Sequence, residues 1–195
     1  MVVYLRTLSE PIRTAAGYAS GELFPLMHAG ALGPFILLAK IEMAREAATL
    51  IMLATVALAA TSTPRSWLAA FSLVFGAWDL AFYASLKLMI DWPQSLSTWD
   101  LLFLLPVPWI GPVLAPVIVA ASLVAGGLVG LHREPARVRG ISWALLLAGG
   151  ALIFTSFIWD WRHIVSGGMP GGFPWAIFAA GEMAGIAGFV SAVKR

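Results

Sequence analysis

Apolar segments long enough to cross a lipid bilayer recur along this chain and constrain its fold more than any other feature. Residues 109–131 and 141–159 contain no charged side chain, and residues 173–192 contain only Glu182. A membrane-spanning helix needs about 20 predominantly apolar residues. Across the chain 60% of residues are hydrophobic and 11% are charged, whereas ordinary soluble domains carry about 25% charged residues. This composition excludes a disordered chain, a nucleic-acid-binding domain and nearly every soluble enzyme.

The apolar pattern predicts an all-α protein, a polytopic transmembrane helical bundle that forms a single domain over residues 1–195. We expect about five spans, at residues 38–61, 67–90, 109–131, 141–159 and 173–192. Residues 1–33 mix polar and apolar side chains and are interrupted by proline and glycine, so we expect an interfacial N-terminal segment. The alternative is a sixth span over residues 22–39.

The segment before the third span is rich in proline. Pro106 and Pro108 are unsuited to a regular helix interior, because proline lacks an N–H donor and clashes with the preceding turn. We therefore expect residues 96–105 to form a short half-helix or interfacial helix, followed by the third span. This stretch is interpreted either as a stiff connection into that span or as a loop that binds a ligand or a partner.

The positions of basic residues and tryptophans predict the orientation of the spans. One side carries most of the Lys and Arg residues that lie outside the spans, namely Arg65, Arg133, Arg137, Arg139, Lys194 and Arg195. The positive-inside rule places this side, and with it the C-terminus, in the cytoplasm. All the tryptophans except Trp78 then fall at a membrane–water boundary, as the rule for aromatic residues expects. We expect the membrane to be the bacterial inner membrane.

A small set of polar side chains lies within the predicted spans. An ionised group at the bilayer centre costs at least about 2.5 kcal/mol, so each needs a partner or a polar cavity. The candidate proton- or ligand-binding residues are Glu42, Arg45, Glu46, Asp79, Tyr83, Lys87 and Glu182. Helical spacing places the first three on one stripe and Asp79, Tyr83 and Lys87 on another.

The first two spans are joined by a short turn, so their stripes are expected to face each other. Arg45 could then reach Asp79, and Lys87 could reach Glu42 or Glu46. One interpretation is an interhelical ion-pair network that fixes the pairing of the helices. The other is a polar cavity that opens outward, with Asp79 and Glu182 as its functional carboxylates.

Residues in the outer loops are weaker candidates for that cavity. Asp100, Asp160 and His163 could lie at its mouth, but loop residues of this kind more often have a solvated surface role. We therefore expect all three on the surface.

Glycine spacing suggests where helices approach closely. Gly126 and Gly130 form one GxxxG pattern, and Gly181 and Gly185, continued by Gly188, form another. Small residues at this spacing let helix backbones come together in lipid. Packing within the bundle is the simpler interpretation, and a dimer contact is the alternative.

No residue pattern identifies a cofactor or a metal site. The chain has no cysteine, which excludes disulfides, iron–sulfur clusters and a thiolate nucleophile. The histidines, at positions 28, 132 and 163, lie outside the confident spans, and a lone histidine does not make a zinc site. The sequence also lacks the HExxH, GxSxG and P-loop motifs. These observations argue against an enzyme.

The sequence supports three hypotheses about function. The first is a membrane protein that acts by association, as a subunit or accessory of a larger membrane complex. The alternative is a small proton- or solute-coupled carrier, or a ligand-binding membrane protein, that uses the buried carboxylates and arginine. The least favoured is an intramembrane enzyme acting on a lipid or quinone. Expected partners are the lipid bilayer and other membrane protein chains or further copies of this one, with no nucleic acid.

Overall fold

A computed structural model describes residues 36–133, 138–165 and 171–193 of the chain. Its long helices are α2 (Ile36–Ala60), α3 (Pro64–Ile90), α4 (Leu114–His132), α5 (Gly140–Phe157) and α7 (Trp175–Val193). The shorter elements are β1 (Trp99–Phe103), β2 (Trp109–Pro112) and α6 (Trp161–Val165). Five of the helical segments are long and apolar enough to cross a membrane. The protein is therefore a multi-pass helical bundle, as the sequence predicted, with a small sheet added.

The helix boundaries agree with the predicted spans except at the third. The expected interfacial segment over residues 1–33, and with it the choice between five and six spans, lies outside the described residues. Helix α3 begins three residues before the predicted start because Thr63 and Ser66 form a capping box and Pro64 occupies the first helical position between them. The Thr63 Oγ1 accepts a 3.1 Å hydrogen bond from the Ser66 backbone N–H.

The predicted short helix over residues 96–105 is wrong. This segment contains β1, which pairs with β2 in an antiparallel hairpin in the register Trp99 opposite Pro112. The third span consequently begins at Leu114 rather than at residue 109. The physical reason is tertiary packing, since apolar side chains on both sides of the hairpin turn form a buried cluster against α2. These side chains are Leu101, Leu104 and Ile110, packed against Met43.

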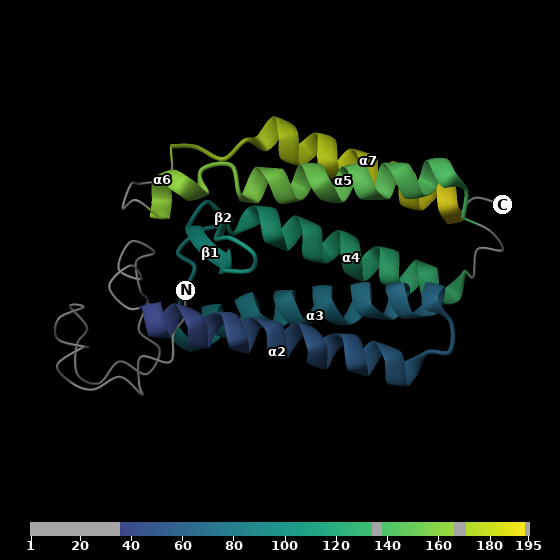
Figure 1. The fold of residues 1–195 in the computed structure, drawn as a ribbon, viewed down its shortest axis with the longest axis horizontal. Coiled ribbons are helices and arrows are strands. Elements are labelled where there is room, and N and C mark those ends of the chain that lie inside the picture. The colour runs from purple at the N-terminus through teal and green to yellow at the C-terminus, as the bar shows by residue number, and fades with distance from the viewer. Residues whose placement is uncertain (1–35, 134–137, 166–170, 194–195) are drawn as a thin grey trace.

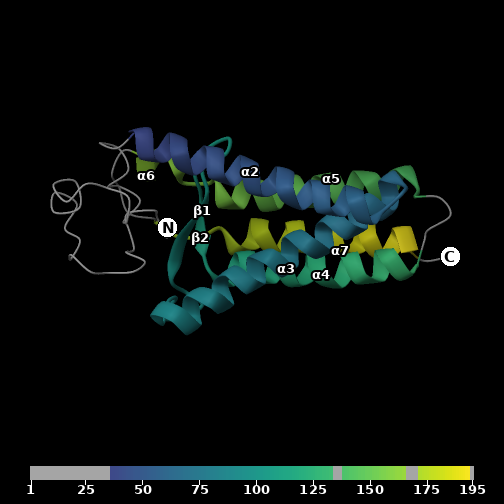
Figure 2. The ribbon, with the colours of Figure 1, turned by 90° about the horizontal axis from the view of Figure 1, so that it is seen from below.

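Helices α3 and α4 lie against each other, and glycines set how closely they approach (Figures 1 and 2). A Cβ added at Gly76 of α3 would lie 2.5 Å from the Ala120 carbonyl oxygen of α4. A Cβ at Gly127 of α4 would lie 2.6 Å from the Ala69 carbonyl oxygen of α3. Only glycine fits at either position, and its absence of a side chain lets the two backbones touch.

Helices α5 and α7 form a second closely packed pair. A Cβ at Gly149 would lie 2.6 Å from the Gly185 backbone nitrogen, and Gly181 and Gly188 face α5 at similarly short range. The glycine pattern in the last span was thus correctly interpreted as packing within the bundle. In α4 the expected pattern holds at Gly130, where an added Cβ would lie 3.0 Å from the Ala69 Cβ of α3. The closest approach, however, is at Gly127 and not at Gly126.

The two ends of the bundle differ in composition. The α2–α3 connection, the C-terminal end of α4 and the end of α7 lie together at one end (Figure 1). We call this the basic end, because Arg65, Arg133 and Arg139 lie at its helix termini. The hairpin, α6 and the end of α3 lie at the opposite end, which we call the hairpin end. The hairpin occupies the space between the α2–α3 pair and the α5–α7 pair (Figure 1).

Candidate functional site

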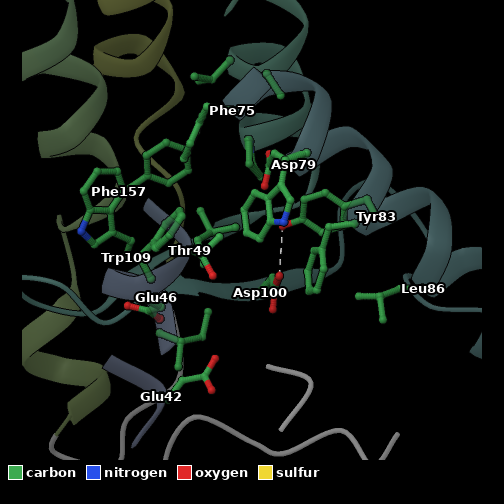
Figure 3. Close-up of a pocket in the computed structure, with 18 of the residues that line it drawn as sticks. Glu42, Glu46, Thr49, Phe75, Asp79, Tyr83, Leu86, Asp100, Trp109 and Phe157 are labelled. Atoms are coloured by element: carbon green, nitrogen blue, oxygen red, sulfur yellow. Dashed lines mark hydrogen bonds between the residues drawn. The ribbon is translucent and has the colours of Figure 1, made fainter. Parts of the chain in front are cut away.

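A cavity of about 90 Å³ lies where the hairpin meets α2, α3 and α4. A water molecule takes about 30 Å³ in the liquid, so this space admits a few waters or a small solute. Its polar lining residues are Glu42, Arg45, Glu46, Thr49, Asp79, Tyr83 and Asp100. Its aromatic lining residues include Phe75, Trp78, Phe82, Trp92, Trp109 and Phe157. Figure 3 shows this cavity with the carboxylates and the rings around it.

Glu46 binds the tip of the hairpin. It lies about two turns inside the apolar span of α2. Its two carboxylate oxygens accept the Leu104 backbone N–H at 2.9 and 3.0 Å, and its side chain is buried. Irregular backbone at membrane depth is stable only where its polar groups are satisfied within the protein. Glu46 supplies that partner, while Pro106 and Pro108 in the turn have no N–H to satisfy.

Glu42 and Arg45 form an ion pair on α2. The Arg45 Nε donates to both carboxylate oxygens of Glu42 at 3.0 Å, and the Arg45 Nη2 also contacts Glu42. The two residues are three positions apart, so the pair satisfies Glu42 without a second helix. The guanidinium that we expected opposite Asp79 thus has a carboxylate partner on its own helix.

Asp100 is a site residue that the sequence placed on the surface, and this expectation is wrong. Only 7% of Asp100 is exposed, because the hairpin carries it into the bundle beside α3. The Tyr83 hydroxyl donates a 3.0 Å hydrogen bond to the Asp100 Oδ2. Tyr83 also stacks on Trp92 with ring centroids 6.2 Å apart. The hairpin and α3 are therefore joined at the cavity by a buried hydrogen bond, and Trp92 from the loop after α3 packs on the same tyrosine.

Asp79 is the exceptional member of the site. It is 9% exposed, lines the cavity, and forms no hydrogen bond or ion pair with any other residue in the part of the chain that the structure describes. Its carboxylate lies within electrostatic range of the Asp100 carboxylate. Figure 3 shows the two acids at the same cavity, one from α3 and one from β1. A buried carboxylate without a protein partner is costly unless a ligand, a proton or water satisfies it.

Two of the seven candidate residues lie outside the cavity lining. Glu182 on α7 accepts a 3.0 Å hydrogen bond from the Ser122 hydroxyl of α4. Lys87 pairs with Asp91 at 2.6 Å and donates to the Pro93 carbonyl at 3.1 Å. The expected contact of Lys87 with Glu42 or Glu46 is therefore wrong. Lys87 lies one turn from the end of α3, where its ammonium binds the capping residue Asp91 and the Pro93 carbonyl beyond the helix instead.

The other two loop candidates lie elsewhere. Asp160 accepts a hydrogen bond from the Gly171 backbone N–H, and His163 is exposed. Within the described ranges, no three His, Cys, Asp or Glu side chains converge as a metal site would require.

One available signal could have identified the hairpin and, with it, Asp100. Two short apolar runs, 99–105 and 109–112, flank a turn with alternating prolines, a pattern typical of paired strands. The aromatic residues of the cavity carried no such signal, because in the sequence they resemble ordinary membrane-boundary or lipid-facing rings.

Comparisons with known proteins add no family to this description. No protein-family model matches the chain, and comparisons with curated proteins and with solved structures likewise find no match.

Proposed function

We propose that this multi-pass membrane protein binds a small solute or a proton in the cavity beneath the hairpin, as a ligand-binding protein or small carrier. The observation that carries this proposal is Asp79, a buried carboxylate that faces a cavity and has no partner among the described residues. Its neighbours in the cavity wall do have partners. If the polar residues served only to stabilise the bundle, a carboxylate without a partner would lower that stability.

The competing interpretation was an interhelical ion-pair network. The Glu42–Arg45 and Lys87–Asp91 ion pairs each join residues on one helix or at its end. Neither pair fixes one helix against another. Close packing of α3 on α4 and of α5 on α7 is explained by the glycines. Asp79, which has no partner among the described residues, is thus left available for binding.

Association with other membrane chains stays a prediction from the sequence. Large apolar side chains such as Ile51, Leu58 and Leu88 are more than half exposed on the helix surfaces. Contact with lipid tails explains these faces as well as contact with a partner does, so they favour neither.

We further propose that the basic end faces the cytoplasm of a bacterial inner membrane and that the cavity lies toward the outer side. Support comes from Arg65, Arg133 and Arg139 at the basic end, because the positive-inside rule counts Lys and Arg near the ends of the spans.

The absence of native cysteine makes a direct test possible, because any introduced thiol is the only one in the chain. Thr49→Cys places a thiol in the cavity lining, and Thr55→Cys places one on an exposed face of the same helix. Both threonines hydrogen-bond to their own helix, through Arg45 and Ile51 carbonyls, so the variants are matched. The reagent is 2-aminoethyl methanethiosulfonate, applied to the chain in lipid vesicles.

We expect the Thr49→Cys thiol to react and the Thr55→Cys thiol, covered by lipid, to resist. If neither thiol reacts, the proposal of an accessible binding cavity is wrong. With sealed vesicles, reaction of Ser97→Cys from only one side reports which way the hairpin end faces, since Ser97 is exposed in the loop before β1.

A further inference from the structure

We propose that the ligand of this cavity is the proton, and that Asp79 is the group that binds it. The Asp79 carboxylate takes up a proton from water at the hairpin end of the bundle and releases it to the same side. This inference rests on the proposed function and selects the proton over a small solute.

The burial of Asp79 and its lack of a partner support this assignment. The residue is 9% exposed, lines the cavity, and forms no hydrogen bond or ion pair within the described part of the chain. The Asp100 carboxylate lies within electrostatic range of it. A carboxylate charge held at membrane depth without a partner is costly. A proton removes that charge and requires no other ligand.

The charged and titratable side chains that line the cavity with Asp79 come from three elements. They are Glu42, Arg45 and Glu46 from α2, Tyr83 from α3 and Asp100 from β1. The lining residues that α4 and α5 contribute are apolar, namely Pro116, Val119, Ala120 and Phe157. Any change in the protonation of this cavity therefore involves Asp79 or a member of that small set.

The contacts of this set single out Asp79. The other three carboxylates, Glu42, Glu46 and Asp100, each accept a hydrogen bond from the protein. Their donors are, in that order, the Arg45 guanidinium, the Leu104 backbone N–H and the Tyr83 hydroxyl. Adding a proton to any of the three weakens a hydrogen bond to a charged acceptor. Adding one to Asp79 breaks no hydrogen bond or ion pair of the described residues.

The neighbours of Asp79 along α3 indicate the side from which the proton arrives. Toward the basic end, a Cβ at Gly76 would lie 2.5 Å from the Ala120 carbonyl oxygen, so the touching backbones leave no room for water between α3 and α4 there. Toward the hairpin end, Tyr83 lies one turn away and donates to Asp100 of β1. The cavity volume of about 90 Å³ corresponds to about three waters, enough for a short hydrogen-bonded chain that carries a proton.

Infrared spectroscopy of the full chain in lipid vesicles measures the bound proton directly. A protonated carboxyl group has a carbonyl band that a carboxylate lacks, and ¹³C in the aspartate carboxyl groups shifts the bands of aspartates alone. We expect a protonated-aspartate band at about pH 5.5, where an aspartate in water is already ionised. Above the pH at which Asp79 titrates, the ratio of its protonated to its ionised form should fall about tenfold per pH unit. Absence of the band at the lower pH would overturn the inference.

Substitutions assign the band to one residue. Asp79→Asn should remove it. Asp91→Asn, at an exposed position outside the cavity, and Glu182→Gln, at the other acid within a span of the described chain, should both preserve it. If Asp79→Asn does not fold, Asp79→Glu keeps the carboxyl group and should move the band from the ¹³C-shifted to the unshifted position. A ¹³C-shifted band that survives substitution of Asp79 would overturn the assignment.

Sealed vesicles test the side of exchange. When only the pH of the outer medium is changed, the fraction of the band that responds should equal the fraction of chains whose hairpin end faces that medium. Labelling of Ser97→Cys with an impermeant reagent measures the second fraction, since Ser97 is exposed in the loop before β1. In a preparation with unequal orientations, a response that follows the opposite fraction would overturn entry at the hairpin end.

The outcomes separate the inference from the proposed function. An unreactive Thr49→Cys thiol overturns the proposed function itself. A reactive thiol in a chain without a protonated-aspartate band, or with a band that Asp79→Asn leaves in place, preserves the cavity and overturns the proton as its ligand.

Discussion

Glu46 of α2 binds the backbone of Leu104 at the tip of the hairpin, with both carboxylate oxygens within 3.0 Å of the same N–H group. The two residues are 58 positions apart in the chain. This contact holds non-helical backbone inside a helical bundle, and it positions β1 so that Asp100 reaches the cavity. The hairpin is therefore part of the site and not only a connection between spans.

Removing the Glu46 carboxylate should destabilise the protein. Glu46→Ala leaves the Leu104 N–H without its acceptor, and a lost hydrogen bond to a charged group costs about 1.5–3 kcal/mol. Glu46→Gln keeps a carbonyl acceptor and should lose less. Denaturant unfolding in detergent, followed by tryptophan fluorescence, measures both. Equal stability of Glu46→Ala and the unsubstituted chain would contradict this role of Glu46.

Substitution by alanine should destabilise the protein at Gly127 of α4 but not at its neighbour Gly126. A Cβ at Gly127 would meet the Ala69 carbonyl at 2.6 Å, so Gly127→Ala forces α3 and α4 apart. Overpacking of this kind costs about 1–3 kcal/mol. The nearest atom to a Cβ at Gly126 is 3.9 Å away, so Gly126→Ala should be tolerated. Thermal unfolding of the two variants measures the difference, and equal losses would place the helix contact elsewhere.

The Tyr83 hydroxyl should contribute to stability through Asp100. Tyr83→Phe removes a 3.0 Å hydrogen bond to a buried carboxylate, with an expected loss of about 1.5–3 kcal/mol. A double-mutant cycle with Asp100→Ala, which removes the acceptor, isolates this contact from changes in packing. Additive effects in the cycle would mean that the two side chains are not coupled.

The Lys87–Asp91 ion pair should contribute little. The Lys87 and Asp91 side chains are 49% and 76% exposed, and exposed pairs contribute about 0–1 kcal/mol. Lys87→Gln should therefore leave the unfolding midpoint nearly unchanged at any salt concentration. A large loss of stability in Lys87→Gln would instead support the interhelical ion-pair network that the sequence suggested.

The class of fold follows from the sequence because the cost of burying polar backbone in lipid leaves few options. Runs of about 20 apolar residues must be helices, and their helical boundaries need only local signals such as the Thr63 cap. The hairpin could not be predicted from the sequence, because Glu46 and Met43 of α2, far away in the chain, stabilise it. Local propensity carries no information about such contacts.

The site could be predicted only in part. Helical spacing correctly grouped Glu42, Arg45 and Glu46, and the structure adds Asp79 and Tyr83 to the same cavity. The partners of these residues depended on the hairpin, so Asp100 was assigned to the surface. Glu182 lies within a predicted span, as Asp79 does, but it accepts a hydrogen bond from Ser122 of α4. The order of the spans does not reveal that α4 supplies this partner.

The cavity lining contains four carboxylates and one guanidinium, and this composition should select reagents by charge. The Thr49→Cys thiol is expected to react faster with the cationic 2-aminoethyl methanethiosulfonate than with the anionic 2-sulfonatoethyl analogue. Dividing by the rates at the exposed Ser97→Cys thiol removes intrinsic differences between the reagents. Charged clefts concentrate ions of opposite sign by about tenfold or more, so a rate ratio of that order is expected. Because Asp79→Asn removes one of the charges, it should lower the ratio, while Asp91→Asn should not. A ratio near unity in the unsubstituted background would show that the cavity carries no effective negative charge.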